Sequence, residues 1–189
     1  MGGEISLVIS NRLGAGGLSI AQNAGIETAL IDHQRYPTRE AFDQDLAGAI
    51  DSAQPDLVVL AGFMRILTPE FVAHFSERLM NIHPSLLPLY PGLHTHQRAL
   101  DNGDSHAGAT VHYVTGELDG GPPVLQAKVP VNSGDDADAL AARVLAVEHQ
   151  IYPVAVNWHL CGRLTWEDGS LIKDGMPVPP SGELWESTS

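Results

Sequence analysis

Residues 57–82 read LVVLAGFMRILTPEFVAHFSERLMNI, and the order of apolar and polar positions in this stretch predicts the fold. Its first four residues are all apolar, which is typical of a strand buried on both faces of a parallel sheet. Pro69 suits the first turn of a short helix that extends to about Phe75, and Leu79–Ile82 predicts a second strand. The stretch therefore predicts a strand, a helix and a strand in succession.

The same alternation continues on both sides of this stretch. The further strands are expected at Ile5–Ser10, Thr28–Ile31, Ala109–Val114 and Val124–Val131, and the further helices at 17–24, Thr38–Ser52, Leu93–Asn102 and from near Asp135 onward. The last helix carries Leu140, Val144, Val147 and Ile151 along one stripe, and Pro153 is expected to kink it. This order predicts an α/β, Rossmann-like fold with a mostly parallel sheet flanked by helices.

The length of 189 residues predicts one domain that spans residues 1–189. Asp168-Gly169 between two short runs predicts a hairpin over Arg163–Ile172, and the Pro-rich segment 175–189 is expected to be an irregular tail.

Composition excludes several classes of function. The formal net charge of −13 disfavours a protein that binds nucleic acid through bulk electrostatics. The lone Cys161 cannot form an internal disulfide, and no apolar run approaches the roughly 18 residues of a membrane span. The start of the chain lacks the features of a signal peptide. We therefore expect a cytoplasmic protein with no membrane or nucleic-acid partner.

Three polar residues suggest a catalytic group. Asn81 and His83 alternate at the end of a predicted strand, so both side chains point to one face at the sheet edge where such folds bind ligands. An amide and an imidazole together can stabilise an oxyanion. Asp119, followed by two glycines, could orient a nearby imidazole and favour its charged form. The alternatives are a strand end with a surface histidine, and an ordinary Asp-Gly turn.

Two other patterns have competing interpretations. Met64-Arg65-Ile66-Leu67 could line a pocket for a flat heteroaromatic ring, or could simply pack in the core. A metal site is not expected, because no Cys or second acid joins the histidines at ligand spacing. The histidines concerned are His94, His96, His106 and His112.

The run Asn81-Ile82-His83-Pro84-Ser85-Leu86-Leu87-Pro88, followed by Tyr90-Pro91-Gly92-Leu93-His94, resembles the folate-dependent formyltransferase family, in particular its members in purine biosynthesis. Asp56–Leu67, Glu117–Pro130 and Glu148–Pro153 share this resemblance. It implies an enzyme that transfers a formyl group from 10-formyltetrahydrofolate, as co-substrate, to the amine of phosphoribosylglycinamide, without a metal. A monomer or a homodimer is expected.

The resemblance also implies roles for individual residues. It makes Asn81, His83 and Asp119 the catalytic group, and it places Glu148 near the amine substrate. The positions that match folate-binding residues of the family are Arg39, Met64, Arg65, Ile66, Leu67 and Asn81.

Other readings remain open at this stage. A formyltetrahydrofolate hydrolase and another amine formyltransferase, such as the enzyme acting on methionyl-tRNA, use the same donor. Family members begin with a strand and a Gly-Ser-Asn loop that binds the substrate phosphate, and neither Gly14 nor the run Gly16–Ser19 matches that loop. We therefore expect an N-terminal unit of about 25 residues to be absent. A folate-binding domain with impaired catalysis is the second hypothesis.

Overall fold

The stretch quoted above folds as predicted, into β3 (Val58–Leu60), α3 (Pro69–His74) and β4 (Leu79–His83). The computed structural model describes residues 2–186. The Thr68 hydroxyl caps α3 by accepting the backbone N–H of Phe71 at 3.3 Å, and Pro69 lies in the first turn, where its missing N–H costs nothing. The backbone N–H of Thr68 donates to buried Asp43 of α2 (Arg39–Ser52) at 2.6 Å, so the start of α3 is fixed to α2.

The main sheet of the described residues has the strand order β10-β6-β5-β4-β3. β3 and β4 pair in parallel, whereas β4 pairs antiparallel with β5 (His106–Tyr113) and β5 pairs antiparallel with β6 (Pro123–Pro130). At the other edge, β10 (Glu183–Leu184) runs parallel to β6. The sheet is therefore mixed, because the hairpin of β5 and β6 brings two antiparallel pairs into it.

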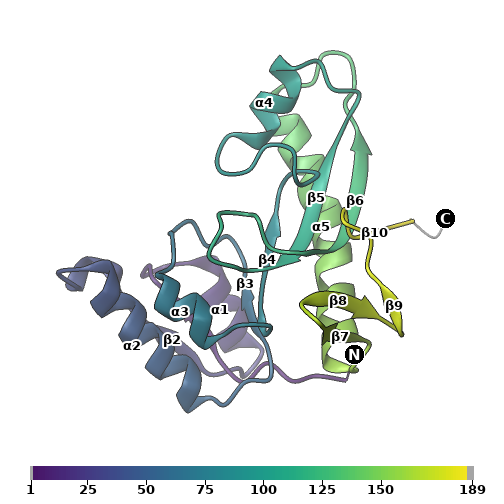
Figure 1. Cartoon of the computed structure of the whole chain (residues 1–189). Helices are drawn as coiled ribbons and strands as arrows, with labels where there is room; N and C mark the ends of the chain where they lie inside the picture. The colour runs from purple at the N-terminus through teal and green to yellow at the C-terminus, as the bar shows by residue number, and fades with distance from the viewer. Residues whose placement is uncertain (1, 187–189) are drawn as a thin grey trace.

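Helices cover both faces of this sheet (Figure 1). Successive β4 side chains point to opposite faces. Leu79 packs with apolar residues of α2 and α3, whereas Met80 packs with apolar residues of α5 (Ala137–Leu160). Both side chains are fully buried. The predicted Rossmann-like α/β fold with flanking helices is therefore confirmed.

A second, two-stranded parallel sheet consists of β1 (Val8–Ser10) and β2 (Thr28–Leu30), which α1 (Gly16–Asn23) connects. Ile9 and Ile31 pack against the apolar cluster that α2, α3, β3 and β4 share. The two-stranded sheet therefore contributes to the core on the α2 and α3 side of the main sheet.

The predicted long helix is α5. Asp136 caps it by accepting the backbone N–H of Ala139 at 2.8 Å. In the predicted stripe, Leu140, Val144 and Ile151 are fully buried, and Val147 is half-buried. The helix continues past Pro153 to Leu160, so this proline does not end it. A shorter helix, α4 (Thr95–Asp101), precedes β5.

The predicted hairpin is also present, as β7 (Leu164–Glu167) and β8 (Ser170–Lys173). The prediction of an irregular tail over 175–189 is wrong in part. β9 (Met176–Pro177) pairs with β8, and β10 joins the main sheet, where the backbone N–H of Trp185 donates to Gln126 O at 2.7 Å. A Pro-rich segment can pair at a sheet edge because only one side needs backbone donors. Residues 187–189 lie outside the described residues.

Within residues 2–186, none of the helices combines the length and the apolar character that crossing a membrane requires.

Candidate active site

Asn81 and His83 lie at the carboxyl end of β4, on the same face of the strand as Leu79. β4 lies inside the main sheet, where β3 pairs with it as far as Asn81 and β5 pairs with it as far as His83. The His83 side chain is buried, with 7% of its surface exposed. Both residues are therefore fixed at the sheet edge that the sequence predicts for a ligand site.

Asp119 reaches His83 from the loop that joins β5 to β6. One carboxylate oxygen, Oδ2, lies 3.4 Å from His83 Nδ1 and accepts the backbone N–H of Gly92 at 2.8 Å. Asp119 has a φ of +50°, in the left-handed region that Asp tolerates better than most side chains. The structure thus brings together the three residues predicted to be catalytic.

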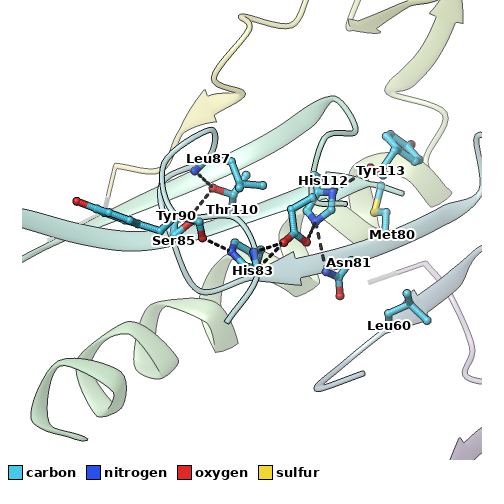
Figure 2. Close-up of polar contacts among 12 residues, drawn as sticks. Leu60, Met80, Asn81, His83, Ser85, Leu87, Tyr90, Thr110, His112 and Tyr113 are labelled. Atoms are coloured by element: carbon cyan, nitrogen blue, oxygen red, sulfur yellow. Dashed lines mark hydrogen bonds and ion pairs between the residues drawn. The ribbon is translucent and has the colours of Figure 1, made fainter. Parts of the chain in front are cut away.

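The second ring nitrogen of His83 also has a partner. Nε2 lies 2.9 Å from the backbone oxygen of Tyr90, and because a carbonyl oxygen only accepts, Nε2 carries a proton and donates it (Figure 2). Nδ1 lies 3.4 Å from the Asp119 carboxylate, so a proton on this second nitrogen would face a negative charge. The site can therefore accommodate a charged imidazole.

His112 belongs to the same cluster, although the sequence singled it out only among histidines unsuited to a metal. It lies opposite Asn81 in the antiparallel pair of β4 and β5 (Figure 2). Its Nδ1 donates to the backbone oxygen of Tyr113 at 2.9 Å, and burial lowers its pKa. Neutral His112 therefore offers Nε2 as an acceptor to the Asn81 amide, whose Nδ2 is 3.3 Å away. This contact fixes which way the amide points.

The loop that follows His83, which contains Pro84, Pro88 and Pro91, is held to the sheet by buried hydrogen bonds. The Thr110 hydroxyl donates to Ser85 O at 2.7 Å and accepts the backbone N–H of Leu87 at 3.0 Å (Figure 2). Gln126 Nε2 donates to Leu87 O at 2.7 Å and to Thr110 Oγ1 at 2.9 Å. The path of the loop, and with it the Tyr90 carbonyl, is therefore set by side chains of β5 and β6.

The segment predicted to bind folate leaves β3 through Ala61 and Gly62. Met64 and Ile66 are 78% and 64% exposed, which is unusual for large apolar side chains. Arg65 lies against α2, with its guanidinium carbon 5.1 Å from the centre of the Phe42 ring, and Leu67 packs on the core cluster. Met64 and Ile66 are therefore accessible to a ligand, while Arg65 and Leu67 point inward.

Arg39 and Glu148 lie on other elements. Arg39 is exposed at the start of α2, where its guanidinium is 3.8 Å from Glu40. Glu148 is half-buried on α5, and this burial raises its pKa. Among residues 2–186, no hydrogen bond or ion pair joins either residue to the cluster of Asn81, His83 and Asp119.

A hollow of about 330 Å³ lies next to Asp119. Its lining differs from the set predicted for folate and is rich in proline and glycine: Leu87, Pro88, Asp119, Gly120, Gly121, Pro123, Pro180 and Ser181. In the part of the chain that the structure describes, no group of three or more His, Cys, Asp or Glu residues could hold a metal ion.

The cluster has the groups that acyl transfer needs. An amide N–H and an imidazole N–H can stabilise negative charge that develops on a carbonyl oxygen, and a carboxylate beside the imidazole stabilises its charged form. No hydroxyl, thiol or amine nucleophile is among these residues, so the arrangement suits direct attack by an external nucleophile.

Comparison with known proteins agrees with this chemistry. The model of the formyl transferase family matches residues 1–156. The chain is 53% identical over 180 residues to the phosphoribosylglycinamide formyltransferase of Escherichia coli strain K12, covering 95% of this chain and 85% of that protein. It is 44% identical over 179 residues to the enzyme of the same name from Haemophilus influenzae, covering 95% and 84%.

Solved structures show the same likeness. The phosphoribosylglycinamide formyltransferase of Coxiella burnetii superimposes with a TM-score of 0.92 at 47% identity, covering 97% of this chain and 86% of that one. The glycinamide ribonucleotide transformylase 1 of Symbiobacterium toebii superimposes with a TM-score of 0.85 at 45% identity, covering 89% and 79%.

Proposed function

The chain belongs to the formyl transferase family, and we propose that it transfers a formyl group from 10-formyltetrahydrofolate to the amine of 5′-phosphoribosylglycinamide in purine nucleotide biosynthesis. The family supports a folate-derived formyl donor, and the names of the similar enzymes support the acceptor. The observation that carries the proposal is the buried contact of Asp119 with His83, beside Asn81, at the carboxyl end of β4.

In the proposed reaction, the amine of phosphoribosylglycinamide forms a bond to the formyl carbon, and the formyl oxygen takes the negative charge. The bond from that carbon to N10 of the folate then breaks, N10 gains a proton and the amine loses one. The Asn81 amide and the charged His83 ring stabilise the oxyanion, while Asp119 keeps the ring charged and oriented.

His83 must exchange a partner during this reaction. In the described conformation Nε2 donates to Tyr90 O and Nδ1 faces Asp119, so neither nitrogen is free for the substrate. The Tyr90 carbonyl is the partner to be exchanged, because the nearby Asp119 carboxylate is proposed to stabilise the charged ring. We therefore expect bound substrate to replace Tyr90 O at Nε2.

Further residues are proposed for binding. Met64 and Ile66 offer exposed apolar surface for the flat pteridine ring directly after β3, whose last residue, Leu60, pairs with Asn81. Glu148 is proposed to contact the amine substrate. The proposed folate-binding set is Arg39, Met64, Arg65, Ile66, Leu67 and Asn81.

Steady-state kinetics of His83→Ala test the proposal. The variant should lose transfer while still binding tetrahydrofolate in calorimetry, because His83 acts on the reacting oxygen and not on the body of the folate. His74→Ala is the matched control, since His74 pairs with Asp51 at 2.8 Å outside the cluster. Undiminished turnover in His83→Ala would refute the site, and a wild-type chain that binds both substrates without turnover would refute the activity.

A further inference from the structure

Tyr152 on α5 places one hydroxyl against two neighbouring strands, β3 and β4. The single hydroxyl proton is shared between two carbonyl acceptors, Leu60 O at 2.8 Å and Met80 O at 3.0 Å. Leu60 is the last residue of β3, and the Met80 carbonyl belongs to the peptide group that joins Met80 to Asn81. One phenol thus contacts both strands, close to the residues of the proposed site that follow in each.

These two carbonyls have particular places in the site. Beyond Leu60 the chain leaves the sheet for the segment 63–67, whose exposed Met64 and Ile66 are proposed to bind the folate ring. Beyond Met80 comes Asn81, the proposed oxyanion donor. A shift of either carbonyl would move the donor-binding segment relative to the catalytic amide.

The helix that supplies this hydroxyl also carries the residue proposed to contact the amine substrate. Glu148 and Tyr152 are four residues apart on α5, so their side chains lie on one face of the helix. The Tyr152 hydroxyl therefore joins the three elements from which the donor segment, the catalytic amide and the amine-binding residue come.

The hydroxyl remains a donor under all ordinary conditions. Burial raises the pKa of the Tyr152 phenol far above its usual range, so it does not ionise at a working pH. Two carbonyl oxygens and one permanent donor form a fixed three-way contact, which α5 holds from outside the sheet.

We propose that Tyr152 is a positioning residue for formyl transfer, whose hydroxyl sets the donor-binding segment after β3 against Asn81 at the end of β4. The inference rests on the proposed assignment of Asn81 and of the Met64–Leu67 segment. Tyr152 itself need not touch the substrates, because it acts through the two backbone carbonyls.

The test compares Tyr152→Phe with Tyr113→Phe. Each variant loses one phenol hydroxyl that links α5 to the sheet. Tyr152 lies on α5 itself, whereas Tyr113 lies on β5 and its hydroxyl hydrogen-bonds with His159 Nδ1 of α5 at 2.7 Å. A role in general helix packing would affect the two variants alike. A positioning role predicts that only Tyr152→Phe raises KM for the formyl donor and lowers kcat, with a loss in kcat/KM of about tenfold to hundredfold.

Thermal unfolding is measured alongside the kinetics, and both variants should melt below the wild type by similar amounts. Wild-type kcat and KM in Tyr152→Phe, or an equal kinetic loss in Tyr113→Phe, would overturn the proposal. The proposed function fails separately, if the wild-type chain has no turnover. In that case the affinity for tetrahydrofolate, measured by calorimetry, replaces KM: weaker binding in Tyr152→Phe alone supports the positioning role, and equal binding overturns it.

Discussion

Replacing Asp119 by Asn removes the negative charge beside His83 and preserves most of the local geometry. Asn tolerates the φ of +50° at this position, and its side-chain oxygen can still accept the Gly92 N–H. The variant therefore isolates the contribution of charge. With Asp119 intact, the carboxylate stabilises the charged ring that the mechanism requires.

The size of the effect follows from the distance and the burial. At 3.4 Å and an effective dielectric constant of about 20, Coulomb's law gives about 5 kcal/mol between full charges. Solvent screening is weak, because the side chains of His83 and Asp119 are only 7% and 10% exposed. The amide dipole of Asn recovers part of this energy, so we expect a loss of about 3 kcal/mol, or about a hundredfold in kcat.

The assay is the rate of tetrahydrofolate formation with both substrates saturating, together with a thermal melt that shows the variant is folded. Asp51→Asn is the matched control, because Asp51 pairs with His74 at 2.8 Å but both side chains are nearly half exposed. Its kcat should stay within about twofold of the wild type. A folded Asp119→Asn variant with near wild-type kcat would refute the electrostatic reasoning.

Three further predictions concern other parts of the molecule. Burial lowers the pKa of His112, so the unfolded chain takes up this proton first as pH falls below 6.5. The free energy of unfolding, from urea titrations between about pH 8 and pH 5, should therefore fall more steeply in the wild type than in His112→Gln, and equal slopes would contradict this. Burial raises the pKa of Glu148, which means that its charged form destabilises the folded state, so Glu148→Gln should increase the free energy of unfolding above neutral pH. The same variant should raise KM for phosphoribosylglycinamide. An unchanged KM would exclude Glu148 from the substrate site. Leu140→Ala should lower the free energy of unfolding by about 2–5 kcal/mol, because the side chain is fully buried, and kcat should be retained at low temperature. A loss below about 1 kcal/mol would contradict this, because it would mean that the surrounding core closes the cavity.

Local signals in the sequence predicted most elements of the fold. These signals depend only on residues that are adjacent in the sequence: the apolar run 57–60, the Asp residues before α5 and the Asp-Gly pair between β7 and β8. The elements that they predict, namely β3, α5 and the β7–β8 hairpin, are all present. β9 and β10 were missed because each is only two residues long, which is too short for a periodic pattern. They exist only through pairing with β8 and β6.

The candidate site could be predicted only where its residues share a local pattern. Asn81 and His83 alternate on one strand, so the period of the strand places them together. His112 escaped prediction because its place opposite Asn81 depends on the register of β4 against β5, and a shift of one residue would turn it to the other face.

The Leu-Asp-Gly-Gly motif illustrates how the structure changes the meaning of a sequence signal. Two glycines follow Asp119, and glycine adopts the left-handed region most easily, yet the residue in that region is Asp119 itself. Gly121 is required for a different reason, since a Cβ there would overlap the Tyr113 carbonyl of β5. This close approach holds the loop against the strand that carries His112, and it brings the Asp119 carboxylate within reach of His83. A larger residue at 121 would push the loop away from β5, and Asp119 would then be withdrawn from His83 although every residue of the cluster remained.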